Sequence, residues 1–441
     1  MRAESSPSVQ HIVVIGGGFA GTTLARALEK QLPAGHQLTL LSEESYTTFN
    51  PMLAEVVGAS VFPEHAVAPI RQMLSKRGGS RFIMGRVGTV DFKRRCVHAS
   101  TLAGPKVLPY DHLVLAFGTR AKLDLVPGLA QHALPLKLVG DAMFIRNRVL
   151  QRIARIELEH DAAERRRLGH FVVIGGGFSG VEVAGSLADF LRGALRFYPR
   201  VARDELNVTI LQDADRLLLD LPEALGHTAA QSLRARGIDV RLKARATRVG
   251  SEGVQLAGGE ALASATVICT IGTRANPLAD QLGLPSQRGR IEVEGDLRVT
   301  GRPGVWALGD CALVPNAATR QASPPTAQFA VAQAHALAHN IAASIRGEPT
   351  RAFAYRSRGM MATTGHLKGV AQLFGLRLSG LPAWMLWRGY YLMRMPTWGR
   401  KLRIWLEWTW SMFFAADITH LRFTRTSEAD DAPPLPSLPV H

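Results

Sequence analysis

Two glycine triplets with the same spacing are the residues best suited to hold a phosphate group. His11 to Leu28 reads HIVVIGGGFAGTTLARAL, and His170 to Leu187 repeats the pattern as HFVVIGGGFSGVEVAGSL. Both fit G-x-G-x-x-G after an apolar stretch: the first glycine permits a tight turn, the second lets backbone approach a pyrophosphate, and the third lets a helix pack on a strand. The helix that follows presents unpaired N–H groups to the phosphates. Two such units predict two dinucleotides held by one chain.

The duplication extends beyond the glycine motifs to a whole module. The first unit is predicted to continue with a helix over Gly21–Gln31 and a strand over Gln37–Leu41, and the second with a strand over Asn207–Leu211. A later strand of each unit ends alike, VLAFGTR at residues 114–120 and ICTIGTR at residues 268–274. A carboxylate just after the second strand commonly accepts a hydrogen bond from a ribose hydroxyl, so we expect this role for Glu43, with a surface turn as the alternative.

Other segments are predicted from periodicity and caps. A charged helix is expected over 138–166, a short helix over Ala68–Leu74 and a long helix over Ser323–Ile345, with Ser323 as its N-cap and Pro324 in its first turn. Near the C-terminus, Trp405, Trp408, Met412 and Ala415 follow helical spacing. Residues 1–9 and the acidic, proline-rich tail after Thr426 are expected to be a loose arm and a disordered tail.

Composition narrows the class of protein. The 441 residues carry a net charge of +16, so nucleic acid, an anionic membrane surface or simply a solvated basic surface could explain the charge. The three cysteines lie far apart and show neither a zinc pattern nor a disulfide framework. His335 and His339 are four residues apart, but no third ligand is nearby in the sequence, so no metal site is expected. Neither a signal peptide nor a transmembrane helix is predicted.

The two modules, the paired Gly-Thr-Arg endings and the segment VWALGDCA at Val305–Ala312 together resemble the flavoproteins with two dinucleotide-binding domains. The resemblance implies an α/β fold of two Rossmann-like domains, with the NAD(P)H domain inserted into the FAD domain and a mostly helical C-terminal region. We place the FAD domain at residues 8–150 and 286–350, the NAD(P)H domain at 151–285, and the C-terminal region at 351–441. No cysteine lies between Tyr46 and Leu74, so a thiol relay is not expected.

A narrower resemblance comes from SPPTAQFAVAQAHALAHNI at Ser323–Ile341, which is similar to the flavin-facing helix of type II NADH dehydrogenases. Pro135-Leu136-Lys137, Gly180-Val181-Glu182 and the segment 361–366 agree with that family as well. The family pattern AQxAxQ is matched by Ala327, Gln328 and Ala330, whereas its second glutamine is replaced by Ala332. The resemblance implies hydride transfer from NADH to FAD and electron transfer to a membrane quinone, without proton pumping. It also implies a peripheral enzyme on the cytoplasmic side of the cell membrane.

The resemblance and the spacing together give the candidate site residues. Gln328 is expected to bond a quinone carbonyl, or only to cap the flavin pocket, and Glu182 to supply a proton, or only to stabilise its helix start. The candidate cofactor-binding residues are Gly16, Gly18, Phe19, Ala20, Gly21, Ser42, Glu43, Asn50, Val87, Ala116, Gly118, Thr119, Gly309, Asp310, Ala327, Gln328, Gly175, Gly177, Phe178, Ser179, Gly180, Glu182, Gln212 and Gly272.

Gln212 bears on the choice between the two nicotinamide cofactors. It stands where NADH-specific family members have an acidic residue that repels a 2′-phosphate. A neutral side chain removes this repulsion. We therefore expect NADPH to be tolerated alongside NADH.

The C-terminal region indicates a membrane surface. Six of the seven tryptophans fall between Trp384 and Trp410, interleaved with arginine and lysine. This mixture is typical of a helix in a bilayer interface, and packing on the protein or at a homodimer interface is the alternative. The rival functions are a soluble flavin reductase with another acceptor, a sulfide:quinone reductase, and a nucleic-acid-binding flavoprotein. Because no nucleic-acid-binding module is visible, no nucleic-acid partner is expected.

Overall fold

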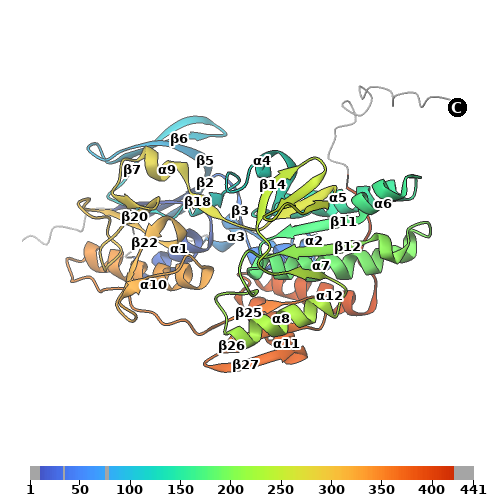
Figure 1. The fold of residues 1–441 in the computed structure, drawn as a ribbon. Helices are drawn as coiled ribbons and strands as arrows, with labels where there is room; N and C mark the ends of the chain where they lie inside the picture. Colours follow the sequence, from blue (N-terminus) through green and yellow to red (C-terminus); the bar gives the residue numbers. More distant parts are fainter. Residues whose placement is uncertain (1–9, 33–34, 75–78, 422–441) are drawn as a thin grey trace, which may run out of the picture.

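The structure of the chain is a computed structural model that describes residues 10–32, 35–74 and 79–421 (Figure 1). The predicted N-terminal arm and the predicted disordered tail lie outside the described residues. Two sheets with parallel centres and helices on their faces form the body, and a C-terminal region packs below the second sheet in the view of Figure 1.

The first sheet has seven strands in the order β21-β8-β1-β2-β5-β6-β7. Its parallel centre consists of β1 (His11–Ile15), β2 (Gln37–Ser42), β8 (His112–Leu115) and β21 (Val305–Ala307). At one side β5 (Ser80–Asp91) continues into an antiparallel meander with β6 (Cys96–Thr101) and β7 (Gly104–Pro109). Along the chain, the strand β21 comes after all the strands of the second sheet and then returns to the first sheet. The predicted fold, one Rossmann-like unit inserted into another, is confirmed.

The second sheet has five parallel strands in the order β10-β17-β11-β12-β13. They are β10 (Ala133–Pro135), β17 (Thr266–Cys269), β11 (His170–Ile174), β12 (Asn207–Leu211) and β13 (Asp239–Arg241). The helices α7 (Phe178–Ala194) and α8 (Glu223–Arg234) follow β11 and β12. A small antiparallel sheet of β14 (Ala246–Gly250), β15 (Gly253–Leu256) and β16 (Ala261–Ala263) is inserted before β17.

The two Gly-Thr-Arg endings meet in space. They form β9 (Thr119–Ala121) and β18 (Thr273–Ala275), which pair antiparallel with Arg120 opposite Arg274. The two copies of the module are therefore joined through their corresponding strand ends.

The glycine turns adopt the same backbone in both copies. Gly16 and Gly175 have φ of +117° and +115°, a region that side chains disfavour. A Cβ at Gly21 would lie 1.9 Å from the Gly16 carbonyl oxygen, and one at Gly180 would lie 1.8 Å from the Gly175 oxygen. The third glycine is thus needed for the helices α1 (Phe19–Gln31) and α7 to start close to their strands.

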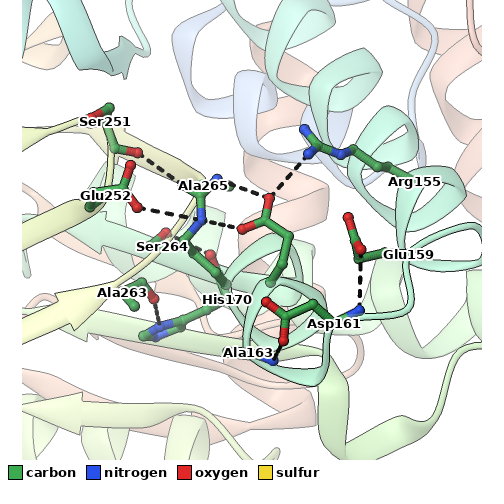
Figure 2. A network of polar contacts seen from close by, with 12 residues as sticks. Arg155, Glu159, Asp161, Ala163, His170, Ser251, Glu252, Ala263, Ser264 and Ala265 are labelled. Carbon is green, nitrogen blue, oxygen red and sulfur yellow. Dashed lines mark hydrogen bonds and ion pairs between the residues drawn. The ribbon is translucent and has the colours of Figure 1, made fainter. Parts of the chain in front are cut away.

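Two helix predictions were wrong at their boundaries. The expected single helix over 138–166 is two helices, α5 (Val139–Ile156) and α6 (Ala162–Gly169), because the Asp161 carboxylate caps α6 by accepting from the Ala163 N–H at 3.0 Å (Figure 2). Arg155 and Arg167 both pair with Glu164, and Arg167 also donates to the Ser251 carbonyl oxygen at 3.0 Å. This network, seen in Figure 2, ties both helices to the β14–β15 turn.

The long helix α10 (Ala327–Ile345) starts four residues later than predicted. Ser323 precedes Pro324-Pro325, and a residue before proline is disfavoured in helical conformation. Thr326 is the N-cap instead, with its hydroxyl accepting from the Phe329 N–H at 3.5 Å. The helix packs along α1 and so brings the two helix starts to one cleft.

The C-terminal region is more than helical. A three-stranded antiparallel sheet of β25 (Gly359–Thr363), β26 (Gly369–Leu373) and β27 (Leu376–Gly380) precedes α11 (Leu381–Arg394) and α12 (Trp398–Phe413). The helical spacing placed Trp405 and Trp408 on one face of the helix, which was wrong. Trp408 is buried at 3% exposure, whereas Trp405 is 52% exposed. Ala415 lies beyond the end of α12. In the described part of the chain, none of the helices could cross a membrane.

Short elements complete the chain. They are β3 (Tyr46–Thr48), η1 (Asn50–Met52), α2 (Leu53–Val57), β4 (Val67–Pro69), α3 (Ile70–Met73), α4 (Leu129–His132), η2 (Leu195–Phe197), η3 (Arg203–Glu205), α9 (Pro277–Gln281), β19 (Ser286–Gln287), β20 (Arg290–Glu292), η4 (Gly309–Cys311), β22 (Ala312–Leu313), β23 (Pro315–Asn316) and β24 (Gln321–Ala322). The helix predicted over Ala68–Leu74 is therefore a strand followed by the single turn α3.

Two glycines on α7 give a matched test of this packing. Gly180→Ala should lower the free energy of unfolding by about 1–3 kcal/mol, because its Cβ has no room beside the Gly175 oxygen. Gly193→Ala, where nothing lies within 4 Å of the added Cβ, should raise it by about 0.5–1 kcal/mol. Urea unfolding of both variants measures the difference; equal effects of the two substitutions would contradict the packing argument.

Candidate functional site

The helices α1, α10 and α11 line an open cavity of about 1090 Å³. Phe19 and Thr22 line it from α1, Gln328 from α10 and Tyr391 from α11, while Phe49 lines it from the loop after β3. Of the predicted site residues, Phe19, Phe178, Ala327 and Gln328 lie on its wall. Its lining is largely aromatic and aliphatic, which suits a flat apolar ring.

A second, smaller cavity of about 130 Å³ lies between η1, α2 and the start of α7. It brings together the predicted residues Asn50, Ser179, Glu182 and Gly272. Lys137 also lines it, and the Lys137 ammonium donates to the Thr119 hydroxyl at 3.4 Å. Residues from the first module, the second module and the Gly-Thr-Arg junction therefore meet at this point.

Glu182 is a buried, hydrogen-bonded acid at the small cavity. Its side chain is buried, and its Oε1 accepts the backbone N–H of Thr363 at 3.2 Å and the indole N–H of Trp387 at 2.9 Å. Burial raises the pKa of Glu182 to about 8, because the charged form loses its water, and the two N–H donors only partly offset this. At neutral pH the acid therefore holds a proton.

A second buried carboxyl, that of Glu55 on α2, repeats this arrangement. It accepts the indole N–H of Trp408 from α12. Burial raises the pKa of Glu55, and the Arg388 guanidinium and the indole donor act in the opposite direction. Sequence reasoning missed Glu55, Trp387 and Trp408 as members of the site. The only signal was an isolated glutamate within the apolar stretch 53–57.

Gln328 is held at the wall of the large cavity by its neighbours. Its Oε1 accepts from the Ser357 hydroxyl at 2.8 Å, and its amide nitrogen donates to the Gly359 carbonyl oxygen at 3.5 Å. Gln333, one position beyond the place where the family pattern has its second glutamine, is buried and turned away. Its Oε1 accepts the Gly309 N–H at 2.8 Å, so it supports the turn η4.

The first glycine turn is assembled with segments from far along the chain. Ala116 lies against Gly16, Ser42 lies against Gly17, and a Cβ at Gly309 would lie 3.0 Å from the Ala20 Cβ. Burial raises the pKa of Asp310 in η4, with Lys137 and Arg290 acting in the opposite direction. The Arg120 guanidinium pairs with Glu43 at 2.9 Å. Gly118, with φ +62°, directly precedes β9, and Thr119 is the first residue of that strand, whereas Val87 lies within β5, next to a bulge.

The nucleotide-facing side of each turn is open. Nothing lies within 4 Å of a Cβ built on Gly18 or Gly177, the N-caps of α1 and α7, and glycine has no side chain that could occupy the helix start. In the second turn the Gln212 Oε1 accepts the Gly176 N–H at 2.9 Å, which leaves the amide N–H₂ as the group that Gln212 can offer to a ribose or a 2′-phosphate. The open helix starts fit two pyrophosphates.

The cysteines do not form a redox pair. All three are free and buried, and the Cys311 thiol donates to the carbonyl oxygens of Leu115 and Leu308. Burial raises the pKa of Cys311 to about 12 and also raises that of Cys269, so neither is a thiolate at neutral pH. Across residues 10–32, 35–74 and 79–421, no cluster of side chains could hold a metal ion.

Residues 10–334 match the sequence model of the pyridine nucleotide-disulphide oxidoreductases. The chain belongs to this family. A type II NADH:quinone oxidoreductase of Mycobacterium tuberculosis is 31% identical over 422 residues, which are 91% of this chain and 87% of the relative. The demethylphylloquinone reductase of Synechocystis is 30% identical over 407 residues, 90% and 95% of the two chains. NDH2 of Plasmodium falciparum, solved with NADH, shares the fold at 18% identity with a TM-score of 0.86, over 93% of this chain and 99% of that one.

Within the pyridine nucleotide-disulphide oxidoreductase family, these relatives group the chain with the type II NADH:quinone oxidoreductases, as the sequence resemblance implied. The cofactors of such an enzyme are FAD and NADH. The open helix start at Gly18, in a turn whose other residues lie against Ser42, Ala116 and Gly309, fits the pyrophosphate of FAD. The equivalent opening at Gly177 fits that of NADH.

The buried acid makes stability depend on pH in a defined direction. Folding raises the pKa of Glu182 from 4.5 to about 8, so the stability gained by holding its proton is lost as pH rises from 4.5 through 8. Glu182→Gln removes this dependence, so the melting temperature of the variant relative to the parent should rise between pH 5 and pH 9. Glu252→Gln, at a side chain 84% exposed, is the control. A difference that stays constant with pH for Glu182→Gln would contradict a buried, protonated acid.

Proposed function

We propose that this chain catalyses hydride transfer from NADH to FAD and the passage of two electrons to a quinone. The carrying observation is the pair of cavities: the small one lies against the second module and holds Ser179 and Gly272, and the large one is walled by Gln328. Bound FAD supplies the group that accepts a hydride and releases two electrons. Donor and acceptor would thus reach it from different sides.

The residues of the small cavity position the nicotinamide. Ser179 and Gly272 come from the NADH-binding module, and Asn50 comes from the FAD-binding module. A ring held between them is oriented and shielded from water, which lowers the barrier by fixing the reacting geometry.

Gln328 orients the quinone in the large cavity. Ser357 occupies its Oε1, so the amide N–H₂ is the end that can donate to a quinone carbonyl oxygen. The aromatic side chains of Phe19 and Tyr391 on the same wall provide surface for the quinone ring.

Proton balance assigns the role of Glu182. NADH, one proton and a quinone give NAD⁺ and a quinol, so one proton must come from the solvent through the protein. Glu182 is buried beside the small cavity and is protonated at neutral pH. We therefore infer that Glu182 donates this proton and is then reprotonated from solvent.

The exposed surface of α12 supports a peripheral membrane position. Its outward side chains are apolar and large: Trp398, Leu402, Trp405, Leu406, Trp410 and Phe413 are each more than half exposed. Arg400, Lys401 and Arg403 lie within its first turns. Cations beside aromatic side chains suit an anionic bilayer surface, and the quinone is dissolved in that bilayer. We propose attachment to the cytoplasmic side of the cell membrane.

The nicotinamide cofactor need not be NADH alone. The side chain of Gln212 is neutral, so it does not repel a 2′-phosphate. Its amide N–H₂ is a donor suited to a phosphate oxygen. We propose that NADPH is also oxidised.

Gln328→Leu tests the quinone site. It should lower the turnover with a water-soluble ubiquinone about tenfold, by the loss of one hydrogen bond in the transition state, and leave anaerobic flavin reduction by NADH unchanged. Stopped-flow absorbance separates the two half-reactions. Gln321→Leu, on the short strand β24, is the control. An equal fall in the rates of flavin reduction by NADH and of reoxidation by quinone, or no fall in the rate of reoxidation, would overturn the assignment.

The triple variant Leu402→Ser, Trp405→Ser and Leu406→Ser tests membrane docking. These side chains are exposed, so folding should persist while co-sedimentation with phosphatidylcholine–phosphatidylglycerol vesicles is lost. Leu102→Ser, an exposed site on the first module, should leave binding intact. If vesicle binding persists while a dimer dissociates on gel filtration, the helix is an oligomer contact and the membrane proposal fails.

A further inference from the structure

The two hydrogen bonds to Glu182 fall on one oxygen. Both the Thr363 N–H and the Trp387 indole N–H point at Oε1, and no donor among the described residues bonds Oε2. In a carboxylic acid one oxygen carries the proton and the other acts as the acceptor. The acceptor is therefore Oε1, and the proton resides on Oε2.

Trp387 is held too tightly to release this bond by rotation. It is fully buried, and its ring centroid lies 4.8 Å from that of Tyr391 and 6.0 Å from that of Trp408. Trp408 is itself bonded to Glu55. Tyr391 lines the large cavity, so Trp387 contacts both the buried acid and one residue of the wall of the quinone cavity.

We propose that Trp387 is a positioning residue for the proton step: its indole N–H fixes Oε1 of Glu182 and so determines that Oε2 bears and delivers the proton. This rests on the proposed role of Glu182 as the proton donor. Thr363 donates through its backbone N–H, which a substitution other than proline at that position does not remove. Among the described residues, Trp387 is therefore the one side chain that donates a hydrogen bond to the Glu182 carboxyl group.

The groups around Glu182 define what a substitution at Trp387 leaves in place. Glu55 faces it from α2 and Tyr391 from α11, while Lys137 and Cys269 line the same small cavity. Arg388 acts on Glu55 rather than on Glu182. None of these groups is altered when only the indole N–H is removed.

Trp387→Phe removes the donor and keeps an aromatic ring. An N–H donor favours the carboxylate, so its loss should raise the pKa of Glu182 and shift the alkaline limb of turnover with quinone upward by about one pH unit. Turnover at neutral pH should fall because the acid is weaker, with KM for quinone and flavin reduction by NADH unchanged.

A spectroscopic readout accompanies the pH profile. In infrared difference spectra, the C=O stretch of the Glu182 carboxyl, identified by its absence in Glu182→Gln, should move to higher wavenumber when Oε1 loses one of its two donors. If Trp387→Phe does not fold, replacement of Trp387 by benzothienylalanine removes the N–H and keeps the shape of the indole. Trp384→Phe, one turn earlier on α11 and without a bond to a carboxylate among the described residues, should move neither readout.

The outcomes separate this proposal from the proposed function. An alkaline limb that persists in Glu182→Gln would show that Glu182 is not the donor and would remove the basis for both. The alkaline limb of the pH profile could be lost in Glu182→Gln, while neither the limb nor the carboxyl band moves when the Trp387 N–H is removed. That result would overturn the role of Trp387 alone. Movement of both readouts at Trp387 and of neither at Trp384 supports it.

Discussion

The burial of one carboxyl group, that of Glu182, is the constraint on which the rest of this structure depends. Its helix begins at the second glycine turn, its Oε1 is bonded by β25 and α11, and its pKa is raised because water is excluded. A buried acid without partners would destabilise the fold, so the C-terminal region must dock for this site to exist. The region that we propose to face the membrane is thereby also part of the proposed proton chemistry.

The two modules around this acid share one fold, and the differences between them match the different roles that we propose for their two nucleotide sites. Both modules contain the same glycine turn, and β9 pairs with β18 where their Gly-Thr-Arg endings meet. Only the first module receives a late strand, β21, followed by a turn that lies against the start of α1. We propose that this turn gives the first site additional contacts for a resident cofactor. Among the described residues no equivalent strand and turn are added to the second sheet, which is consistent with our proposal that its ligand is a substrate that enters and leaves.

The local features of the fold could be predicted from the sequence, because glycine turns and buried strands follow from residues within one short stretch. The apolar strands β1 and β11 and the glycine turns that follow them are such features. Contacts between distant segments could not be predicted. Trp387 meets Glu182 across 205 residues, and Trp408 meets Glu55 across 353. Periodicity also failed for α12, since a helix that is apolar on both sides does not show which side faces inward. At Ser323 the proline pair overrode an ordinary capping signal.

The most direct test of this account is an infrared pH titration of the Glu182 carboxyl in the FAD-loaded enzyme, with Glu182→Gln as the reference spectrum. We expect a protonated carboxyl band at neutral pH that disappears with a midpoint of about 8. A group that is already ionised at neutral pH, with a midpoint near the ordinary 4.5, would contradict the central claim that a buried, uncharged acid supplies the proton.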